Sequence, residues 1–224
     1  MILLGKLKMD YLVNGEFKYT SCFSVNADNV IKAVCETNET IVKNPANLYR
    51  TIDLKTTSSI LGAIYCACLA ENIVGAIINP IEKGHPDIIP ESGRNATEAE
   101  LRNYPYGLEI KTTVGNIKTG ASLHHGQNRL QFLTGITWQA HHQEVRELMG
   151  LIWDFDNLKN DFIFPIITGV FFSSNLVLND WGAISGTTGR NTKVCGMTSS
   201  GRAKMKEGWI VIHKKYIQKY NKLL

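Results

Sequence analysis

The chain has 224 residues, of which 44% are hydrophobic and 20% are charged, and its formal net charge is +4. This composition is typical of a soluble globular protein with a substantial core. It contains no apolar run near the ~18 residues of a transmembrane helix, and its N-terminal segment carries two lysines and an aspartate, which makes a poor signal peptide. We therefore expect a cytoplasmic protein without a membrane segment.

The cysteines agree with a reducing compartment, because their number is odd and no two form a Cys-x-x-Cys pair. In that compartment the glycosylation sequons at Asn38 and Asn95 are accidental. The charge of the chain is uneven: residues 202–224 contain seven Lys or Arg and one Glu. A basic C-terminal segment suits a polyanionic partner, although a solvated helix face explains the charge equally well.

In the first part of the chain, Asn14-Gly15 lies between two short apolar runs and predicts a hairpin within residues 1–25. Helical spacing of apolar residues predicts a helix over 27–42. A second helix is expected to begin at Thr57 or Ser58, either of which can cap it. The apolar stripe of this second helix comprises Ile60, Leu61, Ile64, Cys68 and Leu69.

Glu71 follows this stripe. It comes seven residues after Ile64, which places it within about 20° of Ile64 around a helix axis. A carboxylate so close to an apolar face needs a cation or hydrogen-bond partners. Alternatively, the helix ends before Glu71 and the side chain is exposed.

The remaining apolar runs are short and predict strands. They are 73–78, 87–89, 108–114, 130–138, 151–153, 165–172 and 208–212. Residues 91–106 are expected to form a loop with one helical turn at 97–102, residues 139–148 fit a helix or a strand, and 214–224 fit a basic terminal helix. Mixed strands and helices without a linker predict a single α/β domain, residues 1–224, with a central mixed β-sheet flanked by helices.

Two short motifs carry the candidate chemistry. Pro86-Asp87 opens one predicted strand, and Glu109-Ile110-Lys111 follows on an alternating strand. Alternation places Glu109 and Lys111 on one face about 7 Å apart, with Leu108 and Ile110 on the other.

These residue types suit phosphodiester hydrolysis, which needs an activated water, a stabilised phosphorus and a neutralised leaving oxygen. Asp87, Glu109 and the backbone carbonyl of Ile110 could bind magnesium, and Glu71 could add a further ligand. Lys111 would then hold the attacking water. An Asp followed by Glu-x-Lys also occurs by chance, so a salt-bridged structural cluster remains an alternative.

With the proline before Asp87, the alternating strand and the preceding helix, this region resembles the PD-(D/E)xK nuclease superfamily. The resemblance implies that Asp87 and Glu109 bind Mg²⁺ and that Lys111 assists the water. Segments 138–142, 150–155 and 201–209 are similar to those of bacterial type II restriction endonucleases. The resemblance implies a catalytic core at about 57–155, while 156–224 complete the sheet and contact DNA.

The expected function is therefore Mg²⁺-dependent, site-specific cleavage of double-stranded DNA at a short palindromic sequence by a homodimer. A PD-(D/E)xK nuclease of DNA repair or recombination and a non-catalytic DNA-binding protein are the alternatives. The polar and basic residues considered for DNA contacts are Asn116, Lys118, His125, Gln127, Asn128, Arg129, Gln139, His141, Arg190, Lys193, Arg202 and Lys204.

The paired histidines His124-His125 and His141-His142 do not indicate a metal site. Adjacent side chains on a strand point to opposite faces, and no Cys/His cluster accompanies them. His125 fits a groove-contacting loop or plain surface. His141 fits a position near the active site or a hydrogen-bonded structural histidine.

Overall fold

A computed structural model describes residues 9–116, 138–139, 145–159, 162–184, 194–195 and 197–218, with the backbone alone described at 114–116, 138–139, 157–159, 162 and 194–195. A five-stranded sheet in the order β1-β11-β9-β8-β6 forms its centre. Its strands are β1 (Tyr11–Val13), β6 (Glu109–Asn116), β8 (Leu148–Lys159), β9 (Phe162–Ser173) and β11 (Trp209–His213). Because β6 runs parallel to β8 and the other neighbours are antiparallel, the predicted α/β fold with a mixed central sheet is confirmed.

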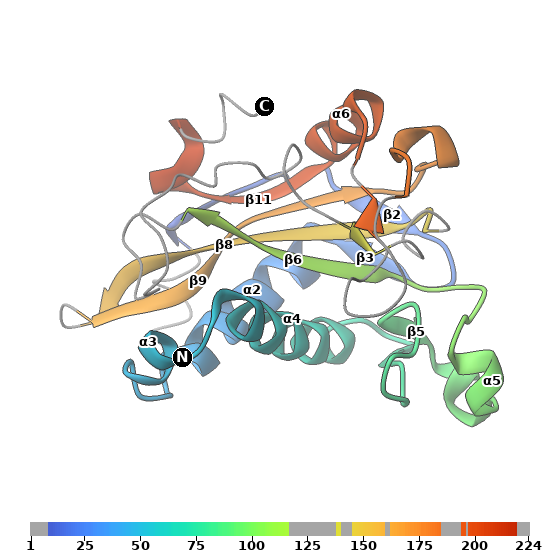
Figure 1. Cartoon of the computed structure of the whole chain (residues 1–224), viewed down its shortest axis with the longest axis horizontal. Coiled ribbons are helices and arrows are strands. Elements are labelled where there is room, and N and C mark those ends of the chain that lie inside the picture. The colour runs from blue at the N-terminus through green and yellow to red at the C-terminus, as the bar shows by residue number, and fades with distance from the viewer. Residues whose placement is uncertain are drawn as a thin grey trace.

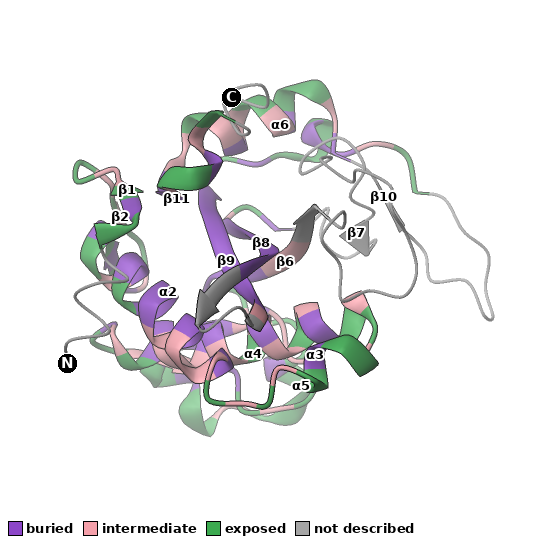
Figure 2. Cartoon of the chain, turned by 90° about the vertical axis from the view of Figure 1, so that its left-hand side faces the viewer, coloured by how far each residue is buried: buried purple, intermediate pink, exposed green. Residues whose placement is uncertain are grey.

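Helices cover both faces of this sheet (Figure 1). The long helices α2 (Ala27–Ile41) and α4 (Leu54–Glu71) pack against each other and against one face, and α6 (Ser199–Glu207) packs on the other. Two hydrophobic clusters result, one on each side, with the buried strands between them (Figure 2). The sheet is therefore largely hydrophobic on both faces, with few buried polar side chains among its central strands.

Shorter elements surround this frame. Three two-stranded pairs are β2 (Lys18–Thr20) with β3 (Ser24–Asn26), β4 (Ala76–Ile78) with β5 (Ile88–Pro90), and β7 (Trp138–Gln139) with β10 (Val194–Cys195). The short helices are α3 (Leu48–Thr51), η1 (Glu91–Asn95), α5 (Glu98–Leu101), η3 (Leu178–Asp180) and η4 (Lys214–Tyr216).

Helix α2 begins where the sequence predicts. Asn26 and Asn29 form a reciprocal capping box, with distances of 2.9 and 3.0 Å between side chain and backbone N–H. Further along, fully buried Asn38 donates to the Tyr11 hydroxyl at 2.8 Å and accepts from the Ile167 N–H at 2.9 Å. The Asn38 amide thus joins α2 to the sheet, and the sequon that contains it is inaccessible in the folded chain.

Helix α4 begins earlier than expected. Its N-cap is Asp53, whose carboxylate accepts from the Thr56 N–H at 2.7 Å, so the predicted start at Thr57 or Ser58 is wrong. Asp53 is a stronger capping candidate because a carboxylate also interacts with the positive end of the helix dipole. The fully buried residues of α4 are Thr57, Leu61, Tyr65 and Leu69, while Ile60, Ile64 and Cys68 of the predicted stripe are partly buried.

Two further expectations at the ends of the chain differ from the structure. Asn14-Gly15 forms a turn, but the strands that flank it do not pair with each other: β1 pairs with β11, and the Asn14 N–H donates to the Ile210 carbonyl at 2.8 Å. Helix α6 was not predicted, because its two lysines and Gly201 leave only a weak apolar pattern. Among the described residues, no helix is both long and apolar enough to cross a membrane.

The Asn38 network gives a first test of the fold. Replacing Asn38 with Ala leaves the buried Ile167 N–H without its side-chain acceptor and removes a partner of the Tyr11 hydroxyl. We expect the free energy of unfolding to fall by about 2–3 kcal/mol in urea denaturation. Lys32→Ala, on the exposed side of the same helix, should change it by less than about 0.5 kcal/mol. An unchanged Asn38→Ala protein would contradict the network.

Candidate active site

The candidate site forms where strand β5 meets the beginning of β6. Ile88 and Leu108 exchange both backbone hydrogen bonds, at 3.1 and 2.8 Å, in an antiparallel bridge. Gly107 permits this approach, because its φ is +147° and a Cβ there would lie 2.3 Å from the Ile88 carbonyl oxygen. Continuing the register by one residue places Asp87 opposite Glu109, in the position where side chains of an antiparallel pair come closest.

Backbone alternation along β6 brings a third group to this edge. The Glu109 N–H donates to the Glu147 carbonyl beside β8, at 3.2 Å. The N–H and carbonyl of Ile110 therefore point the other way, toward β5. The Asp87 carboxylate accepts from the Ile110 N–H at 2.8 Å, in place of a backbone partner. The Asp87 carboxylate and the Ile110 carbonyl thus lie at one edge of the sheet, next to Glu109, which lines a second cavity together with His85.

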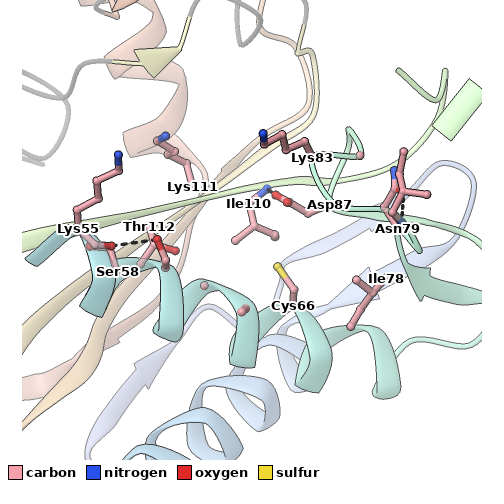
Figure 3. Close-up of a pocket in the computed structure, with 15 residues that line it drawn as sticks. Lys55, Ser58, Cys66, Ile78, Asn79, Lys83, Asp87, Ile110, Lys111 and Thr112 are labelled. Atoms are coloured by element: carbon pink, nitrogen blue, oxygen red, sulfur yellow. Dashed lines mark hydrogen bonds between the residues drawn. The ribbon is translucent and has the colours of Figure 1, made fainter. Parts of the chain in front are cut away.

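The electrostatics of Asp87 reflect a shared negative site. Burial and the neighbouring Glu109 raise the pKa of the Asp87 carboxyl from 3.8 to about 7, against the opposing effects of the Ile110 N–H, His85 and Lys111. Burial and then the same two carboxylates raise the pKa of the Cys66 thiol, which lies on α4 beneath Asp87 (Figure 3). A cation would relieve this concentration of charge.

His85 is a member of the site that the sequence did not reveal. Its Nδ1 lies 2.8 Å from Oε2 of Glu109, and Glu109 itself is only 6% exposed. The His85 N–H donates to the Leu101 carbonyl at 3.2 Å, and the His85 carbonyl accepts from the Tyr104 N–H at 2.7 Å. The loop before β6 therefore positions an imidazole against Glu109. In the sequence, His85 could have been noticed by its position two residues before Asp87.

A cavity of about 580 Å³ opens beside Asp87, between α4 and β6 (Figure 3). Helix α4 approaches β6 closely here: a Cβ added to Gly62 would lie only 2.8 Å from the Thr112 hydroxyl oxygen. Lys111 lines the cavity together with Lys55 and Lys83, two lysines that sequence reasoning did not select. The cavity is large enough for a phosphate group and its sugar neighbours.

The residues present fit a magnesium ion. Mg²⁺ is bound in proteins through one or two carboxylates and keeps several waters, so Asp87, Glu109 and the Ile110 carbonyl are a sufficient protein set. The repulsion from Glu109 that helps to raise the pKa of Asp87 would be relieved by a bound cation, which is compatible with the same ligand. In the part of the chain that the structure describes, no group of three or more His, Cys, Asp or Glu side chains is arranged to hold a metal by side chains alone.

Glu71 is not brought to this site. It is the last residue of α4 and is exposed. It comes five residues after Cys66, and this spacing turns it about 140° away around the helix axis. Its charge acts instead on Cys68, where burial, Glu36 and Glu71 raise the thiol pKa. Ile64, which Glu71 follows by seven residues, lies about 200° around the helix axis from Gly62 and Cys66, which face β6 and the cavity.

The residues considered for DNA contacts are described only in part. Arg202 and Lys204 lie on α6, across the sheet from α4 (Figure 1). Lys204 donates to Asp180 at 2.6 Å and to the Asn175 carbonyl at 2.7 Å, and Arg202 donates to the Met197 carbonyl at 2.9 Å, so both hold α6 to neighbouring segments.

For Asn116 and Gln139 the backbone alone is described, in β6 and β7. Lys118, His125, Gln127, Asn128, Arg129, His141, Arg190 and Lys193 lie outside the described residues.

Comparison of the chain with protein-family models, with curated proteins and with solved structures gave no match.

The raised pKa of Asp87 predicts a pH-dependent stability. Between pH 4 and about 7 the unfolded chain releases the Asp87 proton while the folded chain retains it. The free energy of unfolding, measured by urea denaturation in EDTA, should therefore decline across this range. Asp87→Asn should remove that part of the decline and be more stable than wild type near pH 8.

Glu71→Gln is the matched control, because this carboxylate is exposed and outside the cavity. It should retain the decline of the wild type. Identical pH profiles for wild type and Asp87→Asn would show that Asp87 is not in the strained electrostatic environment described above.

Proposed function

We propose that this protein is a magnesium-dependent endonuclease that cleaves double-stranded DNA, of the type II restriction kind within the PD-(D/E)xK superfamily. The observation that supports it most is the pairing of Ile88 with Leu108, which sets Asp87 opposite Glu109 at a strand edge. Lys111 follows Glu109 by two residues, on the same side of β6. This arrangement has the residue types and the spacing that phosphodiester hydrolysis requires.

In this proposal Asp87, Glu109 and the Ile110 carbonyl hold the magnesium ion. When bound, the ion supplies positive charge that stabilises the transition state at phosphorus and the leaving oxygen. Lys111 orients the attacking water with its ammonium group and stabilises the negative charge that develops. His85 keeps Glu109 in position through the 2.8 Å contact with its carboxylate. Helix α4 packs closely against β6 at Gly62 and Thr112 and forms one wall of the cavity beside Asp87.

Cleavage of both strands of a short palindrome would use two copies of the chain, one active site for each strand. A homodimer is therefore part of the proposal. A repair or recombination nuclease would use the same chemistry on a different DNA structure. A DNA-binding protein would use the acidic and lysine residues as a structural cluster without hydrolysis.

Incubation with supercoiled plasmid and Mg²⁺ separates these functions. The proposal predicts discrete fragments that EDTA abolishes. Smearing or nicking confined to branched substrates would favour the repair nuclease, and binding without cleavage would favour the non-catalytic protein.

Lys111→Ala tests the assignment within the site. We expect the rate of cleavage to fall by about 10²–10³-fold, because a charged group that acts on the transition state is lost. DNA binding in Ca²⁺ should change much less. Lys32→Ala, which removes an exposed lysine of α2, is the control and should cleave at the wild-type rate. Full activity of Lys111→Ala would contradict the proposed role.

A further inference from the structure

Three lysines from separate segments line the cavity beside Asp87. Lys55 comes from the first turn of α4, Lys83 from the loop between β4 and β5, and Lys111 from β6. Their ammonium groups point to the same side of β6, and Lys111 lies between the other two (Figure 3). Neither Lys55 nor Lys83 has a part in the proposed hydrolysis itself, so their presence in the cavity requires a separate explanation.

We propose that Lys55 and Lys83 bind backbone phosphates of the cleaved strand on opposite sides of the scissile phosphate. This inference rests on the proposed nuclease function and adds two phosphate contacts along the cleaved strand. The carboxylates of Asp87 and Glu109 would otherwise repel a DNA strand, and cations at both ends of the cavity offset that repulsion. An ammonium group on a flexible stem suits a phosphate as a point charge and does not select a base.

The loop that carries Lys83 is fixed to the catalytic segment. The Asn79 N–H donates to the Asp87 carbonyl at 2.8 Å, and the Asn79 side chain donates to the carbonyls of Pro86 and Leu101 at 3.1 and 2.9 Å. A turn closed by the Gly84 N–H and the Ile81 carbonyl, at 3.1 Å, then presents Lys83. The position of Lys83 relative to Asp87 is therefore set by buried hydrogen bonds.

Lys83 occupies a locally unfavourable backbone conformation. Its φ is +59°, in the left-handed region that glycine and asparagine adopt more readily than lysine. Lys83 is exposed, and within the described residues no carboxylate pairs with it. A lysine at this position costs stability and makes no compensating contact in the described fold, which is the pattern expected of a ligand-binding residue.

Lys55 is also placed against local preference. It is the second residue of α4, where the positive end of the helix dipole disfavours a cation. Eleven residues separate it from Cys66, which lies beneath Asp87, and this corresponds to about 16 Å along the helix. At roughly 3.4 Å of rise per nucleotide of a strand, Lys55 would meet a phosphate several nucleotides from the scissile bond.

The salt dependence of DNA binding tests the two contacts. Affinity for a short mixed-sequence duplex would be measured in Ca²⁺ by fluorescence anisotropy across a range of salt concentrations. Lys55→Ala and Lys83→Gly should each weaken binding several-fold and lower the slope of log affinity against log salt by roughly one. Lys32→Ala, far from the cavity on α2, should leave the slope unchanged.

Lys83→Gly also separates binding from folding. Glycine accepts the positive φ, so the melting temperature should stay the same or rise while DNA affinity falls. Lys83→Asn, which also tolerates this φ, provides a second variant and should show the same loss of affinity.

Duplexes that contain the cleavage site mapped from the wild-type plasmid digest, with one neutral methylphosphonate, locate each contact. The loss of affinity caused by Lys83→Gly should disappear when the phosphate that Lys83 binds is neutral. The loss caused by Lys55→Ala should disappear at a phosphate on the other side of the scissile bond. Unchanged salt slopes, or losses that no single methylphosphonate removes, would overturn the inference while leaving a cleaving wild type in place. A wild type that neither binds nor cleaves DNA would overturn the proposed function, and this inference with it.

Discussion

The site depends on the backbone pairing of Ile88 with Leu108. Both residues are buried, at 0% and 1% exposure, and Gly107 gives the chain the conformation that the pairing needs. Once this bridge forms, strand geometry places Asp87 beside Glu109 and turns the Ile110 peptide toward them. Hydrophobic side chains on both faces of the sheet thus fix the positions of charged groups at its edge.

This arrangement concentrates negative charge where water is limited. Burial and Glu109 raise the pKa of Asp87, and the Ile110 N–H, His85 and Lys111 oppose that increase. A fold selected for stability alone would gain from replacing one of the carboxylates. The presence of both carboxylates beside a cavity lined by lysines is consistent with a site that binds a cation and a phosphodiester.

Local patterns in the sequence predicted the parts of the site that strands determine. Two-residue alternation placed Glu109 and Lys111 on one side of β6, and the mixture of helical and strand patterns predicted the α/β sheet. The neighbours of these residues were harder to predict, because they depend on tertiary contacts. His85 reaches Glu109 through a loop held by Leu101 and Tyr104, and the side of α4 that faces β6 is set by Gly62 and Cys66. For that reason Glu71 was assigned a role that its exposed position does not support.

The central claim is that Asp87 and Glu109 bind one magnesium ion together. Isothermal titration calorimetry of the wild-type protein with MgCl₂ should give one binding site per chain. Glu109→Gln should weaken that binding by at least about tenfold, because one of the two carboxylate ligands is lost. Glu71→Gln should bind as the wild type does. Undiminished magnesium affinity in Glu109→Gln would contradict the account.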